Sequence, residues 1–203
     1  LRFPPQRILV HTAIIKAEAV RYHWLRPDSI SVVGIPHYDH YMAGPAIPRA
    51  DFLRSLGLDP ARRTILYAPV CDYRLQENSV DAYVTGILAG LGMNVIVRFP
   101  PAAAVKLDDY SVSPSVFFDH PGYAFDPERI DDRDVTPEDD ARFVNELAAC
   151  DLVVAGPSTV AIDAAFFDKP IVFVDFYPRP LPPDERIYEY GAEHILNIFA
   201  TGG

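Results

Sequence analysis

Short apolar runs alternate with stretches of helical spacing along most of the 203-residue chain. The runs are rich in β-branched residues and are bounded by Gly, Pro, Asp or Asn, which is typical of parallel strands covered on both faces. We predict strands over residues 8–12, 30–33, 64–70, 95–99, 116–119, 152–155 and 171–174. Strands that alternate with helices indicate an α/β protein with a parallel sheet and crossover helices.

The predicted helices have start and stop signals. Thr136, Pro137 and Asp139 combine a capping side chain, a proline at the first helical position and an acid in the first turn, so we predict a helix to about Cys150. Helices are also expected over 13–24, near 52–56 before Gly57, and near 195 before a last strand to 198. Another helix is expected after Asn78 and before Gly92, with these apolar positions on one buried face: Val80, Tyr83, Val84, Ile87, Leu88 and Leu91.

This order of elements predicts a Rossmann-like doubly wound domain. In such sheets ligands bind at the carboxyl ends of the strands, near the switch in strand order. The loops that leave strands at that edge are expected at 68–78, 98–104, 156–159 and 175–183. The chain has no G-x-G-x-x-G after a first strand, no G-x-x-x-x-G-K-[ST] and no G-x-S-x-G, so it lacks the usual dinucleotide, P-loop and hydrolase signatures.

Binding chemistry can be argued most closely for residues 151–176, DLVVAGPSTVAIDAAFFDKPIVFVDF. Gly156 and Pro157 end a buried strand, and Ser158 or Thr159 can cap the helix that follows. A helix that begins beyond the carboxyl end of a parallel strand offers free backbone N–H groups and the positive end of its dipole to an anion. The pattern fits a phosphate or diphosphate site, and it fits an ordinary capped helix equally well.

Composition limits the possible partners. Lys and Arg total 18 against 28 Asp and Glu, which gives a net charge of −10 and argues against a nucleic-acid surface. The acids between 126 and 140 are expected in a solvated loop and helix start. Cys71 and Cys150 are interpreted as reduced core thiols of a cytoplasmic protein. No apolar run approaches the roughly 18 residues of a membrane span.

Three other polar sites have competing interpretations. His37 and His40 with Asp39 between them could chelate a metal, but three neighbours on one loop are weak evidence, and we predict no metal site. His120 could act as a base, although a lone loop histidine is more often structural. Arg98, at a strand end, could bind a phosphate or pair with one of the many acids.

Several short motifs, in this order and spacing, resemble the C-terminal half of GT-B glycosyltransferase-like proteins. They are Gly34-Ile35-Pro36-His37-Tyr38-Asp39, Ile65-Leu66-Tyr67-Ala68-Pro69, Val97-Arg98, Ser158-Thr159 with Asp163, and Asp168-Lys169-Pro170. The resemblance covers about residues 30–176 and is greatest to the CDP-glycerol glycerophosphotransferase group. The segment 74–78, RLQEN, is also similar to an arginine-rich loop of UDP-N-acetylglucosamine 2-epimerases.

The resemblance implies a site for a nucleotide diphosphate donor, used as a substrate without a further cofactor. It implies that Ser158 and Thr159, beside Gly156, bind the donor diphosphate and that Asp163 faces the ribose hydroxyls. Arg98 would lie near the phosphates, and Pro69 and Arg74 would line the nucleotide pocket. The sequence departs from the group after Arg98, where Phe99-Pro100-Pro101 stands in place of the usual histidine.

The implied function is donor binding in a transferase half-domain that serves glycosyl or glycerophosphate transfer in cell-surface polymer synthesis. The alternatives are a sugar-nucleotide 2-epimerase of the same fold and a non-catalytic binding or assembly domain. Residues 1–28 would be the tail of an N-terminal domain or a linker, and 29–203 the donor-binding domain. Both ends look truncated, so we expect the rest of the N-terminal domain as a partner, with peripheral membrane association of the full-length protein an open alternative.

Overall fold

The computed structural model describes residues 5–69, 80–102, 110, 113–126, 133–156, 158–174 and 180. The chain divides into two compact units, residues 1–44 and residues 45–203. The division falls after the strand at residues 30–32, which the sequence placed in the second domain beyond a boundary at 28. This strand groups with the first unit because it pairs with the strand at residues 8–10.

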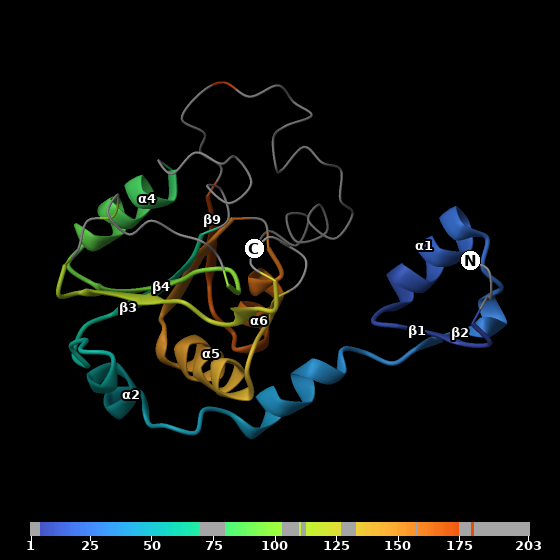
Figure 1. The fold of residues 1–203 in the computed structure, drawn as a ribbon, viewed down its shortest axis with the longest axis horizontal. Coiled ribbons are helices and arrows are strands. Elements are labelled where there is room, and N and C mark those ends of the chain that lie inside the picture. Colours follow the sequence, from blue (N-terminus) through green and yellow to red (C-terminus); the bar gives the residue numbers. More distant parts are fainter. Residues whose placement is uncertain are drawn as a thin grey trace. The chain divides into compact units, whose positions relative to one another are not determined.

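The first unit is a single β–α–β arrangement followed by helical turns (Figure 1). Strands β1 (Ile8–Val10) and β2 (Ile30–Val32) pair in parallel, and Val10, Ala19 and Ile30 form a small core beneath α1 (Ala13–His23). Thr12 follows β1 and caps α1 by accepting the Ile15 N–H (3.2 Å). The loop that holds His37 and His40 contains the 3-10 helix η2 (Pro36–Ala43), and a shorter 3-10 helix, η1 (Pro27–Ser29), precedes β2.

The second unit contains a five-stranded parallel sheet, which confirms the predicted α/β Rossmann-like fold. Its strands are β3 (Thr64–Ala68), β4 (Asn94–Arg98), β5 (Val116–Asp119), β8 (Leu152–Ala155) and β9 (Ile171–Phe173). They lie in the order β5-β4-β3-β8-β9, so the chain moves outward in one direction from β3 and then returns to the other side of it. The switch in strand order therefore lies between β3 and β8.

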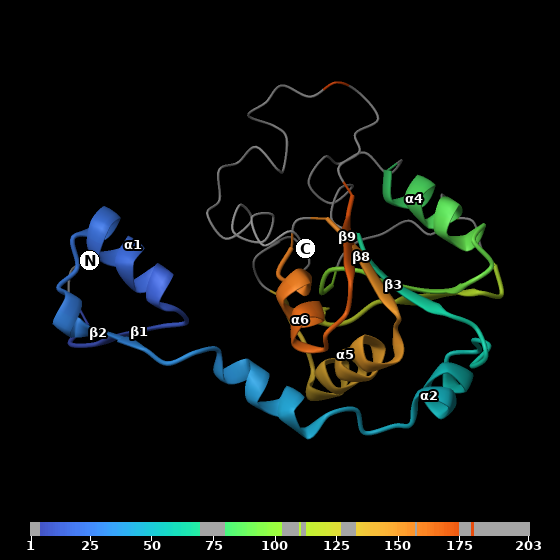
Figure 2. The same ribbon diagram turned by 180° about the vertical axis from the view of Figure 1, so that it is seen from behind.

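Helices cover both faces of this sheet (Figures 1 and 2). They are α2 (Arg49–Ser55), α4 (Val80–Ala89), α5 (Pro137–Ala149) and α6 (Val160–Phe166), and a short antiparallel pair, β6 (Tyr123–Ala124) and β7 (Arg133–Asp134), precedes α5. Gly57 and Gly92 follow α2 and α4 with positive φ angles (75° and 72°), as the sequence predicted for helix stops. The region near 195–198 lies outside the described residues.

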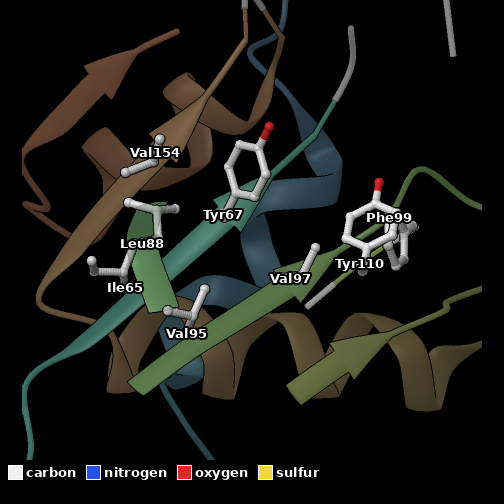
Figure 3. Close-up of a cluster of buried hydrophobic side chains, with 8 residues drawn as sticks. All are labelled: Ile65, Tyr67, Leu88, Val95, Val97, Phe99, Tyr110 and Val154. Carbon is white, nitrogen blue, oxygen red and sulfur yellow. The ribbon is translucent and has the colours of Figure 1, made fainter. Parts of the chain in front are cut away.

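Alternate residues of the central strands enter cores on opposite faces. Figure 3 shows the cluster on the α4 face, which consists of Ile65, Tyr67, Leu88, Val95, Val97, Phe99, Tyr110 and Val154. Leu66, Ile96 and Val153, which alternate with these residues, are fully buried as well. Both faces of β3, β4 and β8 are thus closed, which is why their sequences read as continuous apolar runs.

The prediction that the apolar residues of α4 form one buried face is wrong in part. Val80 and Leu88 are buried, but Tyr83, Ile87 and Leu91 are 58%, 50% and 53% exposed. The helix turns its polar residues Asp81 and Thr85 inward instead, where the Thr85 hydroxyl donates to the Asp81 carbonyl (2.8 Å). Because a hydrogen bond satisfies each of these groups, burying them costs less than apolar spacing alone suggests.

Cys150 ends α5 as a buried free thiol. Burial raises the pKa of this thiol to about 12, so it remains protonated, as expected for a core cysteine. Cys71 lies outside the described residues. Among the helices that the structure describes, none is both long enough and apolar enough to cross a membrane.

The start of α5 carries the predicted capping box, and its removal has a measurable cost. The Asp139 N–H donates to the Thr136 hydroxyl (3.1 Å), while the Thr136 N–H donates to the Asp139 carboxylate (3.0 Å). Thr136→Ala is expected to lower the free energy of unfolding by about 1 kcal/mol, whereas Thr136→Ser, which keeps the hydroxyl, changes it little. Chemical denaturation measures both variants, and equal stability of the two would contradict the capping role.

Candidate functional site

The carboxyl ends of β3 and β8 meet at the switch point. Ala68 of β3 lies in register with Ala155 of β8, and Pro69 and Gly156 follow them directly, both buried. Along the chain β3 is followed by α4, and β8 by α6. The structure therefore brings Pro69 together with Gly156, which belong to two of the loops that the sequence assigned to one rim.

The helix at this point begins without a side-chain cap, contrary to the sequence-based expectation. The Ala161 and Ile162 N–H groups donate to the Ser158 and Thr159 carbonyls (3.2 and 2.8 Å), but the Thr159 side chain makes no capping hydrogen bond. The Ser158 Oγ atom is buried and has no hydrogen-bond partner in the described structure. Because Thr159 itself is already in the helical conformation (φ −63°, ψ −15°), its hydroxyl is not placed as a cap.

Asp163 lies one turn into α6 with only 7% of its surface exposed. It sits on the same buried side of the helix as Ala161 and Ala164. Its carboxylate is thus directed into the fold close to the switch point, as expected for an acid on the inner side of this helix. Contact with a ribose stays a prediction.

Arg98 pairs with acids, one of the two interpretations left open by the sequence. It ends β4 opposite Asp119 of β5, and its guanidinium donates to the Asp119 and Glu146 carboxylates (2.5 and 3.1 Å). It also donates to the Asp139 carbonyl (3.3 Å) and lies 4.5 Å from the centroid of the Phe143 ring. The side chain is 10% exposed, so its charge serves protein partners in this structure, and contact with a phosphate stays a prediction.

The acids around Arg98 form a buried network that the sequence did not reveal. Asp119 and Glu146 are 1% and 0% exposed, and Arg142 donates to the second oxygen of Asp119 (2.7 Å). Burial raises the pKa of Glu146 to about 8 despite the opposing attraction of Arg98. Only the position of Asp119, at a strand end in register with Arg98, could have signalled this pairing from the sequence.

Asp139 joins this network to the segment that follows β5. Its carboxylate accepts the N–H groups of Gly122 and Thr136 (both 3.0 Å), so it is not one of the solvated acids expected between 126 and 140. Burial alone would raise the pKa of Asp139, but these hydrogen bonds hold it below its ordinary value. Gly122, with a φ of 79°, leaves no room for a side chain, since a Cβ would lie 2.6 Å from the Asp134 carbonyl oxygen.

The remaining candidates are Arg74 and three histidines, His37, His40 and His120. Arg74 is outside the described residues, as are the predicted rim positions 70–79 and 175–179. His120 is exposed and stacks on Phe99, with 4.6 Å between ring centroids, which fits a packing role. In the first unit the rings of His37 and His40 pack edge to face at 4.6 Å.

The fold is that of a GT-B-like Rossmann domain. Solved structures of similar fold include UDP-GlcNAc 2-epimerase from Methanocaldococcus jannaschii (TM-score 0.55, 15% identity, 86% of this chain and 48% of that chain). They also include UDP-GlcNAc 2-epimerase from Neisseria meningitidis bound to UDP-GlcNAc (TM-score 0.55, 10% identity, covering 97% of this chain and 53% of that chain). A third structure of similar fold is a variant of the wall teichoic acid polymerase TagF (TM-score 0.52, 14% identity, covering 92% of this chain and 44% of that chain).

These similarities concern the fold. The chain spans about half the length of each of these proteins. No model of a known protein family matches the sequence, and no curated protein matches it.

Proposed function

We propose that this chain is the donor-binding half of a GT-B-type transferase that takes a nucleotide diphosphate donor. The donor would be CDP-glycerol or a nucleotide sugar, and the transferred group glycerophosphate or a glycosyl unit for a cell-surface polymer. The observation that carries the proposal is the start of α6 at the switch point. A helix begins there without a side-chain cap, and Ser158 beside it has a buried hydroxyl with no hydrogen-bond partner among the described residues.

The chemistry of that position suits a diphosphate. The Ala161 and Ile162 N–H groups already donate to the Ser158 and Thr159 carbonyls, but the helix dipole still places partial positive charge at the start of α6. A diphosphate there would accept the Ser158 hydroxyl, which would remove the cost of leaving that hydroxyl unpaired. When the donor bond breaks, the same groups would stabilise the negative charge that develops on the leaving diphosphate.

The Ser158 hydroxyl gives a specific test of this proposal. Ser158→Ala is expected to weaken CDP or UDP binding about tenfold, because a hydrogen bond to a charged group contributes about 1.5–3 kcal/mol. The same change should leave the stability unchanged or raise it, since no residue in the described part of the chain pairs with the hydroxyl. Calorimetric titration and thermal unfolding measure the two effects.

Ser55→Ala provides a matched control for Ser158→Ala. The Ser55 hydroxyl donates to the Phe52 carbonyl (2.7 Å) at the end of α2, away from the switch point. This variant should lose a little stability and keep its nucleotide affinity. If Ser158→Ala binds the diphosphate as tightly as the unchanged protein, the proposed position of the diphosphate is wrong.

Two other functions remain as alternatives. A sugar-nucleotide 2-epimerase shares the fold, and the RLQEN segment at 74–78 resembles an epimerase loop. Product analysis with the full-length protein separates epimerisation from transfer. A non-catalytic binding domain is favoured by the engagement of Arg98 with Asp119 and Glu146, which leaves the site without this arginine.

We also propose that an N-terminal domain of the same protein completes the first unit. Two parallel strands of three residues each are too few for an independently stable sheet. Leu9, Val32 and Trp24 are 64%, 47% and 88% exposed in this unit. Since the acceptor site would lie on the other domain, the chain alone should bind donor weakly and show no turnover, and measurable turnover would contradict this division of roles.

A further inference from the structure

The 3-10 helix η2 places two histidines on one side. His37 and His40 lie three residues apart within it. A 3-10 helix has about three residues per turn, so side chains at positions i and i+3 lie directly above one another. Asp39 lies on another side of this helix by the same geometry. The expectation of no metal site considered the three residues as neighbours on a loop, whereas the structure sets His37 and His40 apart as a pair.

The two imidazoles are close enough to bind one ion. A ring nitrogen of His37 and one of His40 lie within 4.8 Å of each other, and the ring planes are inclined by 74°. Both side chains are exposed, so a hydrated ion has access to them. An ion bound to both nitrogens in adjacent positions, at about 2.0 Å from each, needs them about 3 Å apart. Small rotations of two exposed side chains provide this closure.

Two tyrosine rings support the pair. Tyr41 is 3% exposed, and its ring centroid lies 4.5 Å from that of His40 and 5.9 Å from that of His37. Tyr38 stacks on Tyr41 with 5.1 Å between the centroids and 24° between the planes. A buried ring in contact with both imidazoles limits the orientations that they adopt. Less conformational entropy is therefore lost when an ion fixes them.

We propose that His37 and His40 bind one divalent transition-metal ion, with Cu²⁺ preferred. Imidazole is a ligand for Cu²⁺, Ni²⁺ and Zn²⁺, and two histidines one turn apart on a helix bind the same ion. Two imidazoles with water in the remaining positions suit the tetragonal geometry of Cu²⁺, which also has the highest affinity of these ions for nitrogen ligands. Zn²⁺ sites normally have three or four protein ligands, so Zn²⁺ binds less tightly here. This site is independent of the proposed nucleotide site.

Titration calorimetry with Cu²⁺ and with Zn²⁺ tests the proposal. The chain should bind one Cu²⁺ with a dissociation constant in the micromolar range, and Zn²⁺ about tenfold more weakly or less tightly still. The electron paramagnetic resonance spectrum of the Cu²⁺ complex should show coupling to the nitrogens of two imidazoles. A chain that binds no Cu²⁺ below about 100 µM, or a spectrum with fewer than two imidazoles, would overturn the proposal. Zn²⁺ binding as tight as that of Cu²⁺ would contradict a site with two protein ligands.

Variants locate the ion on η2. His37→Ala and, separately, His40→Ala should weaken Cu²⁺ binding about tenfold or more, because each leaves a single imidazole. His120→Ala is the matched control, since His120 is also exposed and packs on an aromatic ring, that of Phe99 at 4.6 Å, but lies outside η2. Circular dichroism establishes that the variants are folded, and His37→Gln and His40→Gln keep more of the side-chain volume beside Tyr41. Cu²⁺ affinity that is unchanged in the folded His37 and His40 variants would show that this pair is not the site.

Discussion

Replacing Arg98 by methionine is expected to lower the free energy of unfolding of the second unit by about 3–5 kcal/mol. The buried carboxylate of Asp119 would lose one of its two arginine partners, and Glu146 would lose the donor to its Oε2 atom. Removing one partner of a buried ion pair is costly because the remaining charge keeps its desolvation penalty without the compensating attraction. Urea denaturation followed by circular dichroism measures the loss.

Arg54→Met is the matched control for this effect. Arg54 pairs with Asp51 at 2.6 Å on α2, but both side chains are more than half exposed. Such surface pairs contribute little, so the control should change the stability by less than about 1 kcal/mol. If Arg98→Met is no less stable than Arg54→Met, the network around Arg98 does not hold the strand ends together.

Glu146→Gln is expected to change how stability depends on pH. The folded-state pKa of Glu146 is raised to about 8 from an ordinary value of 4.5, chiefly by burial. Between these values the folded protein binds a proton that the unfolded chain has released, so stability falls as pH rises. This group alone contributes a slope of about −1.4 kcal/mol per pH unit between pH 5 and 7, and glutamine removes it.

The measurement compares unfolding free energies of the two proteins at pH 5, 6 and 7. As pH rises, the unchanged protein should lose stability relative to Glu146→Gln. Glutamine is neutral at every pH, so the variant does not have to bind a proton when it folds. Glu138→Gln serves as the control, since it removes an exposed carboxyl from the first turn of the same helix. A pH-independent difference between Glu146→Gln and the unchanged protein would show that Glu146 is ionised in the folded state.

Much of the fold could be predicted because its strands and helices have local signals. The apolar run at residues 152–155 is a strand buried on both faces, and Thr136, Pro137 and Asp139 start α5 with the expected capping box. Alternation of strands and helices also predicts that the sheet is parallel, since crossover helices join parallel neighbours. These features depend on contacts close in sequence or on a general topological rule.

The rest depends on contacts distant in sequence. The partners of Arg98 are 21 and 48 residues away, so no local pattern distinguishes pairing with acids from binding a phosphate. The inward turn of Asp81 depends on the Tyr67 hydroxyl of β3, which apolar spacing along α4 cannot reveal. Ser158 and Thr159 have the composition of a cap, but the backbone at Thr159 is already helical.

Titration of the protein with CDP, UDP and GDP tests the central claim most directly. Isothermal calorimetry should show a single site for one pyrimidine nucleoside diphosphate, with weak affinity for the chain alone and higher affinity for the full-length protein. The corresponding nucleoside should bind more weakly, because the start of α6 would contact the diphosphate. Absence of nucleotide binding, even by the full-length protein, would contradict both the transferase and the epimerase functions.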